Sequence, residues 1–232
     1  MRYGFALAMS KALASFALIF VLVFAQTSSA RAEPVSIVAF GDSLTQGFGL
    51  HAENGFVPQL ADWLKVNSTE AGAVRLINAG VSGDTTAGGA ARVDWTLTDD
   101  VDGMIVALGG NDLLRGIDPA VSRANLEKIL QAAATRDVPV LLVGLVATAN
   151  MGPSFKQAFD QMYPDLSAQY DTLYARDFFI GLLEPDGTVD RDKVRARMQL
   201  DGIHPNKDGV RDIVQGLGPA VIELIAQARS RG

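Results

Sequence analysis

The stretch Ile37-Val38-Ala39-Phe40-Gly41-Asp42-Ser43-Leu44-Thr45 decides how the rest of the chain is interpreted. A short apolar run that ends at a glycine predicts a strand buried on both faces, as in a parallel sheet. Gly41 permits a sharp turn, so Ser43 follows the carboxyl end of the strand, the edge at which open α/β sheets bind ligands. Two interpretations of Ser43 stay open at this point: a nucleophile, or part of a helix N-cap.

Composition narrows the class of protein. The chain has 232 residues, of which 48% are hydrophobic, and this suits one domain of ordinary size. A formal net charge of −6 argues against nucleic-acid binding, which needs a basic patch. The absence of Cys excludes disulfides, zinc thiolates and a Cys nucleophile. His51 and His204 are the only histidines, so a His-rich metal site is excluded. We also expect that the protein needs no metal or cofactor.

The N-terminus has the pattern of a targeting segment. Arg2 and Lys11 precede or flank an apolar run from residue 12 to residue 25, and Ala30-Arg31-Ala32 fits a small-x-small cleavage site. The run is shorter than the ~20 residues that a spanning helix needs. The pattern predicts a signal peptide over 1–32, one domain over 33–232, a periplasmic or secreted bacterial protein, and no stable membrane anchor after cleavage. An uncleaved anchor is the alternative.

After residue 33, predicted strands alternate with predicted helices. The alternation indicates a parallel sheet with helices on both faces. The strands are expected at 35–41, 74–78, 103–108, 138–146 and 172–175, and the helices after Asn54, at 86–97, after Asp118-Pro119, at 155–169 and after Asn206. The helix that Asp118-Pro119 opens is expected to bury Val121 in its apolar stripe. Gly218-Pro219 is expected to break the last helix.

Three of the predicted strands end in turns of small residues, at 41–43, 78–83 and 109–112. The carboxyl ends of parallel strands meet at one edge of the sheet. A serine nucleophile needs hydrogen-bond donors for the oxyanion that it creates. The backbone N–H groups of Ser43 and Gly80 and the side-chain amide of Asn111 are candidates. A plain turn role for Asn111 also fits the pattern.

A serine nucleophile also needs a base, and the base needs an acid that orients it. Asp201 stands three residues before His204, with Gly202 between them. The carboxylate can therefore fold back onto Nδ1 and leave Nε2 for Ser43. The alternative base is His51, with Glu53 as its acid, but polar neighbours favour a solvated loop there.

Four blocks in this order resemble the characteristic blocks of the SGNH/GDSL hydrolase family. The blocks are Gly41-Asp42-Ser43-Leu44, residues 78–85, Gly109-Gly110-Asn111-Asp112 and residues 201–206. The similarity extends from about Val35 to the C-terminus. Residues 44–50 and Leu114-Arg115-Gly116 are similar to its secreted bacterial branch of thioesterases, lysophospholipases and arylesterases.

The resemblance implies both a fold and a set of site residues. It implies a flavodoxin-like three-layer α/β/α sandwich with five parallel strands in the order 2-1-3-4-5. Ser43, Asp201 and His204 would form the catalytic triad, and Ser43, Gly80 and Asn111 the oxyanion hole. Of the four blocks, none departs from the family's pattern.

These observations predict a secreted serine esterase that hydrolyses short- to medium-chain acyl or aryl esters through an acyl-enzyme. Thioesters and lysophospholipids are expected as further small-molecule substrates. An acyl groove is expected along Leu113, Leu114, Ala147, Met151 and Phe155. Two alternatives remain: a carbohydrate acetylesterase on the same scaffold, and a non-catalytic flavodoxin-like binding protein in which Ser43 is only a cap.

Overall fold

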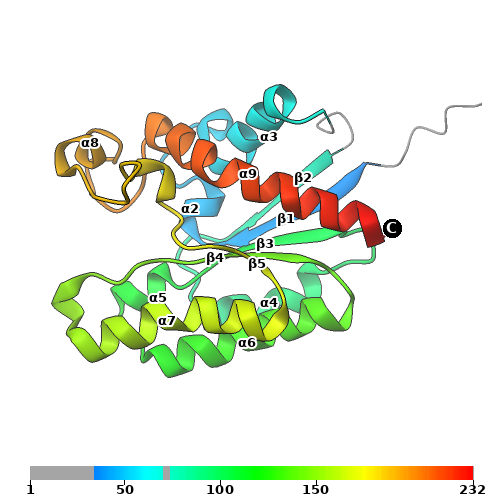
Figure 1. Cartoon of the computed structure of the whole chain (residues 1–232), viewed down its shortest axis with the longest axis horizontal. Helices are drawn as coiled ribbons and strands as arrows, with labels where there is room; N and C mark the ends of the chain where they lie inside the picture. Colours follow the sequence, from blue (N-terminus) through cyan, green and yellow to red (C-terminus); the bar gives the residue numbers. More distant parts are fainter. Residues whose placement is uncertain (1–33, 70–73, 232) are drawn as a thin grey trace, which may run out of the picture. The chain divides into compact units, whose positions relative to one another are not determined.

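A five-stranded parallel sheet organises the part of the chain that the computed structural model describes, residues 34–69 and 74–231. The strand order is β2-β1-β3-β4-β5, and helices flank the sheet (Figure 1). The fold that the resemblance implied is therefore confirmed. The strands are β1 (Val35–Gly41), β2 (Val74–Gly80), β3 (Gly103–Ala107), β4 (Val140–Val143) and β5 (Leu173–Ala175). The expected signal peptide lies outside the described residues.

Strand β1 carries the opening stretch of the sequence, and all seven of its residues are buried. It pairs with β2 on one side and with β3 on the other, so Gly41 is aligned with Gly80 and with Ala107. A strand with neighbours on both sides and helices over both faces has no polar face, which explains its uninterrupted apolar sequence.

Two layers of helices enclose the sheet. In Figure 1, α3 and α9 cover one face, and α4, α6 and α7 cover the other. The bounds are α3 (Phe56–Asn67), α4 (Thr86–Thr96), α6 (Pro119–Thr135), α7 (Pro153–Tyr170) and α9 (Lys207–Arg231). The short helices α2 (Ser43–Gln46), α5 (Gly110–Leu114) and α8 (Arg191–Ala196) lie at the carboxyl edge of the sheet. Within the described residues, no helix is both long and apolar enough to cross a membrane.

The expected break at Gly218-Pro219 is wrong, because α9 runs without interruption through Pro219. Proline costs a helix about 3 kcal/mol through its missing N–H and its ring. Here Leu217 and Val221, on either side, are both buried against the core. A Cβ at Gly218 would lie 2.5 Å from the Trp63 ring, so glycine lets α3 approach closely. Packing of the apolar face offsets the cost of the proline.

Two smaller expectations are also corrected. The N-cap of α3 is Gly55, not Asn54; Asn54 ends a short 3₁₀ turn, and its carbonyl accepts a hydrogen bond from Gln59 Nε2 at 2.8 Å. Val121 is 50% exposed and is not part of the buried stripe of α6. Asp118 does cap α6, through a 2.9 Å bond from the N–H of Ala120.

Candidate active site

Ser43 is the first residue of α2, directly after the turn at the end of β1. Asp42 is the N-cap, since its Oδ1 accepts the N–H of Leu44 at 3.0 Å. The capping role therefore belongs to Asp42, and the Ser43 hydroxyl is left for another partner. Gly41 is required here, because a Cβ would lie 2.1 Å from Thr45 Oγ1 and 2.7 Å from the carbonyl oxygen of Ala107.

The structure brings Ser43, His204 and Asp201 into one line of hydrogen bonds. His204 Nε2 lies 2.9 Å from Ser43 Oγ, and His204 Nδ1 lies 2.7 Å from Asp201 Oδ2. With Nδ1–H donated to the carboxylate, Nε2 is free to accept the serine proton. His51 is exposed, and it does not line the cavity described below.

Asp201 is held as a carboxylate by its own turn. Its Oδ1 accepts the N–H of His204 at 3.0 Å and the N–H of Ile203 at 2.9 Å. These backbone bonds, together with the His204 side chain, lower the pKa of Asp201 to about 2. Gly202 adopts φ +67, a left-handed conformation that glycine accepts without strain. The turn therefore presents a fixed negative charge to the imidazole.

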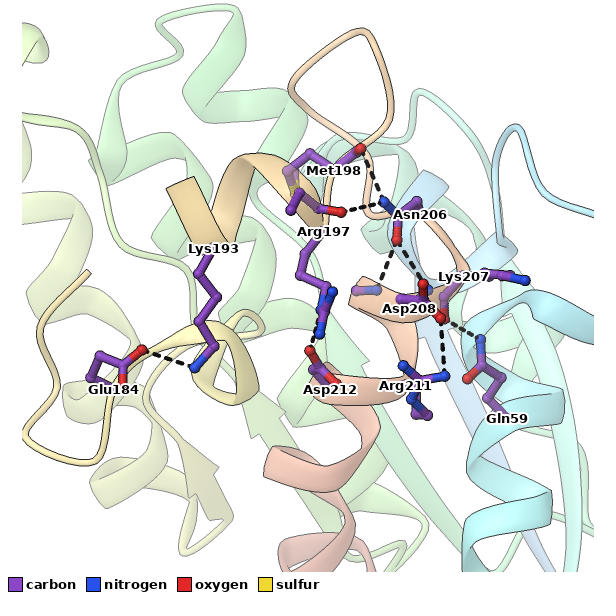
Figure 2. Close-up of polar contacts among 12 residues, drawn as sticks. Gln59, Glu184, Lys193, Arg197, Met198, Asn206, Lys207, Asp208, Arg211 and Asp212 are labelled. Carbon is purple, nitrogen blue, oxygen red and sulfur yellow. Dashed lines mark hydrogen bonds and ion pairs between the residues drawn. The ribbon is translucent and has the colours of Figure 1, made fainter. Parts of the chain in front are cut away.

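The segment that carries His204 is fastened to the start of α9 (Figure 2). The Asn206 Nδ2 donates to the carbonyls of Ala196 at 2.8 Å and Met198 at 3.2 Å. Its Oδ1 accepts the N–H groups of Asp208 and Gly209, both at 3.0 Å. One side chain thus caps α9 and ties down the chain between α8 and the histidine. The expectation that Asn206 caps the last helix is confirmed.

Three further contacts stabilise the same segment. Arg197 Nε donates to Asp212 Oδ2 of α9 at 2.5 Å (Figure 2). The Phe48 ring lies over the imidazole of His204, with ring centroids 4.6 Å apart. Gln199 Nε2 donates to the Phe48 carbonyl at 2.8 Å and so joins the two loops. The Phe48 ring therefore covers one side of the imidazole, and the backbone that carries His204 is fixed by these contacts.

The expected placement of the Gly80 amide is not what the structure shows. The N–H of Gly80 donates to Asn78 Oδ1 at 3.0 Å, and Gly80 does not line the cavity. Its role is packing, because a Cβ there would lie 2.3 Å from the backbone nitrogen of Gln46 in α2. Gly83, three residues later, lines the cavity instead. Its N–H has no protein acceptor among the described residues.

The loop that carries Gly83 is fixed from two sides. The Gly83 carbonyl accepts Arg115 Nη2 at 3.0 Å, and its φ of +84 requires glycine. Behind it, the buried Asp112 accepts the N–H and hydroxyl of Thr86 at 2.8 and 2.5 Å. Because Asp112 adjoins Asn111, this contact couples the Gly83 loop to the Asn111 turn. The run Ser82-Gly83-Asp84 was the signal in the sequence for this second glycine.

Asn111 and Asp42 meet beside Ser43. Asn111 Nδ2 lies 3.3 Å from Asp42 Oδ2, and both residues line the cavity. Burial raises the pKa of Asp42 to about 6, opposed by the Leu44 amide, by Asn111 and by His204. The carboxyl orients the Asn111 amide toward the cavity wall that contains Ser43.

An apolar cavity of about 720 Å³ extends from Ser43. Of the expected acyl-groove residues, Leu113, Leu114 and Ala147 line it, but Met151 and Phe155 do not. Phe155 packs against Phe159 within α7, with ring centroids 6.0 Å apart, so it supports the core instead.

Much of the remaining apolar wall comes from residues that the sequence did not single out. They follow β4 or belong to the segment between β5 and the histidine: Leu145, Val146, Thr148, Phe179, Leu182, Leu183, Val189, Val194 and Met198. Lys193 Nζ and Glu184 Oε1, 2.9 Å apart, join α8 to the loop before it (Figure 2). The available signal was Val189, Val194 and Met198, which recur every four or five residues in an otherwise charged segment. Within residues 34–69 and 74–231, no group of three His, Asp or Glu side chains is arranged to hold a metal.

A Ser–His–Asp line at the carboxyl edge of a parallel sheet, next to an apolar cavity, is the arrangement of a serine hydrolase. Residues 39–211 match the model of the GDSL-like lipase/acylhydrolase family. The chain is 34% identical over 200 residues to esterase TesA of Pseudomonas aeruginosa, covering 86% of this chain and 92% of that one. It is 33% identical over 176 residues to thioesterase 1/protease 1/lysophospholipase L1 of Escherichia coli K12, covering 75% and 76%.

A solved structure agrees with these matches. The esterase AlinE4, described as an SGNH-hydrolase family esterase, superposes with a TM-score of 0.64 at 38% identity and covers 82% of this chain and 96% of its own. The chain belongs to the GDSL-like lipase/acylhydrolase family. It is a carboxylic ester hydrolase.

Proposed function

We propose that this ester hydrolase works through an acyl-enzyme on Ser43. The observation that carries the proposal is the 2.9 Å contact from His204 Nε2 to Ser43 Oγ at the end of the apolar cavity. The Ser43 oxygen attacks the acyl carbonyl while Nε2 takes the hydroxyl proton and then delivers it to the leaving alcohol. Water, deprotonated by the same nitrogen, then attacks the acyl carbon; the bond to Ser43 Oγ breaks, Nε2 returns the proton to that oxygen, and the acid leaves. Asp201 stabilises the imidazolium that forms between these steps.

The developing oxyanion needs donors that point to one place. We propose the N–H groups of Ser43 and Gly83 and the side-chain amide of Asn111. Ser43 and Gly83 have no protein acceptor for their N–H among the described residues, which leaves both for a ligand. Gly83 takes the role that the sequence suggested for Gly80, whose N–H is bonded to Asn78.

We propose short- to medium-chain acyl or aryl esters as substrates, with thioesters and lysophospholipids turned over as well. The apolar wall supports this range, since each buried methylene contributes about 0.8 kcal/mol. The two relatives described above, an esterase and a thioesterase/protease/lysophospholipase, support the same classes. A periplasmic or secreted location, with cleavage after Ala32, is part of the proposal, and N-terminal sequencing of the exported protein tests it.

The nucleophile is tested by replacing Ser43 with Ala and measuring turnover of p-nitrophenyl acetate and p-nitrophenyl octanoate. We expect kcat to fall roughly 10⁴-fold or more with an unchanged melting temperature, because alanine fits the first position of α2. Ser82→Ala is the matched control: Ser82 also lines the cavity, but its hydroxyl donates to Gln46 Oε1 at 3.0 Å. An inactive Ser82→Ala beside an active Ser43→Ala contradicts the proposal.

A further inference from the structure

Besides Asp42 and His204, the cavity wall contains a third ionisable group, the carboxyl of Asp177, which the proposed reaction does not use. Asp177 is only 8% exposed. Leu145, Phe179 and Leu182, which line the same cavity, are apolar. A buried carboxyl costs free energy unless it is paired, so its place in a surface that would otherwise suit plain hydrocarbon calls for a partner.

Only one of its two oxygens is occupied. Asp177 Oδ1 accepts the N–H of Phe179 at 3.0 Å, which fixes the orientation of the carboxyl. In the part of the chain that the structure describes, Oδ2 accepts no hydrogen bond and has no ion-pair partner. Burial raises the pKa of Asp177, opposed by the Phe179 N–H and by the charge of Arg176. The cavity therefore contains an oriented acceptor without a donor.

The backbone at this point is rigid. The N–H of Phe178 donates to the carbonyl of Gly144, which follows β4, at 2.9 Å. The Asp177 carbonyl accepts the N–H of Ile180 at 3.1 Å. A group held on such a frame loses little entropy when it binds a ligand.

Sheet register sets the distance from Ser43. Gly41 is aligned with Ala107, Val106 with Leu142, and Val143 with Ala175, so the strand ends are level across β1, β3, β4 and β5. Ser43 and Asp177 each follow the last aligned residue of their strand by two positions. Three interstrand spacings place the aligned strand ends Gly41 and Ala175 ~14 Å apart, and we take the span from Ser43 to Asp177 to be of this order.

That span corresponds to an acyl chain of definite length. An extended chain advances ~1.3 Å per methylene, given C–C bonds of ~1.5 Å. A chain with its carbonyl at Ser43 that follows the sheet edge past Leu145 reaches Asp177 after about ten to twelve carbons.

We propose that Asp177 is a specificity-determining residue that binds a hydroxyl group at the far end of such an acyl chain. The inference rests on the proposed acyl-ester hydrolysis and adds the class of acyl group. A hydroxyl is favoured over an ammonium group, because a cation buried in this apolar wall loses several kcal/mol of hydration that one carboxylate does not return. A hydroxyl costs less to bury, and its bond to a carboxylate is short and strong.

The test compares matched p-nitrophenyl esters: decanoate and dodecanoate, each with its ω-hydroxy counterpart. For the wild-type protein we expect kcat/KM to be roughly tenfold or more higher for the hydroxylated member of the better pair, the range of a hydrogen bond to a charged group. Asp177→Leu is expected to prefer the plain chain, and Asp177→Asn to keep part of the preference for the hydroxyl.

p-Nitrophenyl acetate is the internal control, because its acyl group is too short to reach Asp177. We expect either substitution to change kcat/KM on acetate far less than kcat/KM on the ω-hydroxy ester, so the preference is measured as the ratio of the two within each protein. Intact acetate turnover with no preference for the hydroxyl in the wild type overturns the inference and leaves the proposed function standing. A preference for an ω-amino chain over the ω-hydroxy chain also overturns it. Failure of the wild type on acetate contradicts the proposed function itself.

Discussion

Replacing Asp42 with Asn tests the electrostatics of the nucleophile turn. Asp42 is 2% exposed, and burial raises its pKa from 3.8 to about 6. Its charge is faced by His204, by Asp84 and by the Asn111 amide, but desolvation is the largest effect. Asparagine keeps the bond from Leu44 and removes the titration.

The sign and size of the effect follow from linkage. The folded protein holds the Asp42 proton more tightly than the unfolded chain does, so this stabilisation is complete below pH 3.8 and is lost as the pH rises to about 6. A difference of about two pKa units corresponds to about 3 kcal/mol. From about pH 4.5 to about pH 7.5, the wild type should therefore lose about 2 kcal/mol of unfolding free energy relative to Asp42→Asn.

Urea denaturation of both proteins, followed by circular dichroism across this pH range, measures the difference directly. Groups that titrate in the same way in both proteins do not contribute to the difference in unfolding free energy. Asp201→Asn, measured from about pH 4.5 down to about pH 2, is the control of opposite sign: the pKa of Asp201 is lowered to about 2, so its stabilisation is present above pH 3.8 and is lost as the pH falls toward 2. A free-energy difference between wild type and Asp42→Asn that does not change with pH would refute the reasoning.

Three further predictions concern catalysis, the cavity and α9. Asn111→Ala should lower kcat by about 10²–10³, the usual loss for one oxyanion donor; a change confined to KM would make Asn111 a ground-state contact. Val146→Ala should lower kcat/KM on p-nitrophenyl octanoate more than on the acetate, whereas Met151→Ala should affect both alike, since only Val146 lines the cavity; equal losses for Val146→Ala would place the acyl chain elsewhere. Gly218→Ala should destabilise the protein by about 1–3 kcal/mol in urea, because its Cβ meets the Trp63 ring; an unchanged or higher midpoint would show that α3 yields without cost.

Contacts near in sequence were predictable from the residues alone. The run before Gly41 is apolar at every position, so it forms a strand that is buried on both faces of the sheet. Strand β1 and its turn could therefore be predicted from the local sequence. Asp201 reaches His204 through a turn of three residues, and Asn206 caps the helix that follows it. In each case the partners are separated by so few bonds that the chain itself brings them together.

Tertiary structure decided the features that depend on distant partners. A glycine pattern marks both Gly80 and Gly83 as turns, but only the packing of α2 against β2 shows which amide is left for a ligand. From the sequence we expected Met151 at the cavity. Instead, Asp177 lines it, because Asp177 follows β5, whose end is aligned with that of β4. The direction of a side chain is set by the elements packed around it, and those contacts join residues too far apart in sequence for any local pattern to encode.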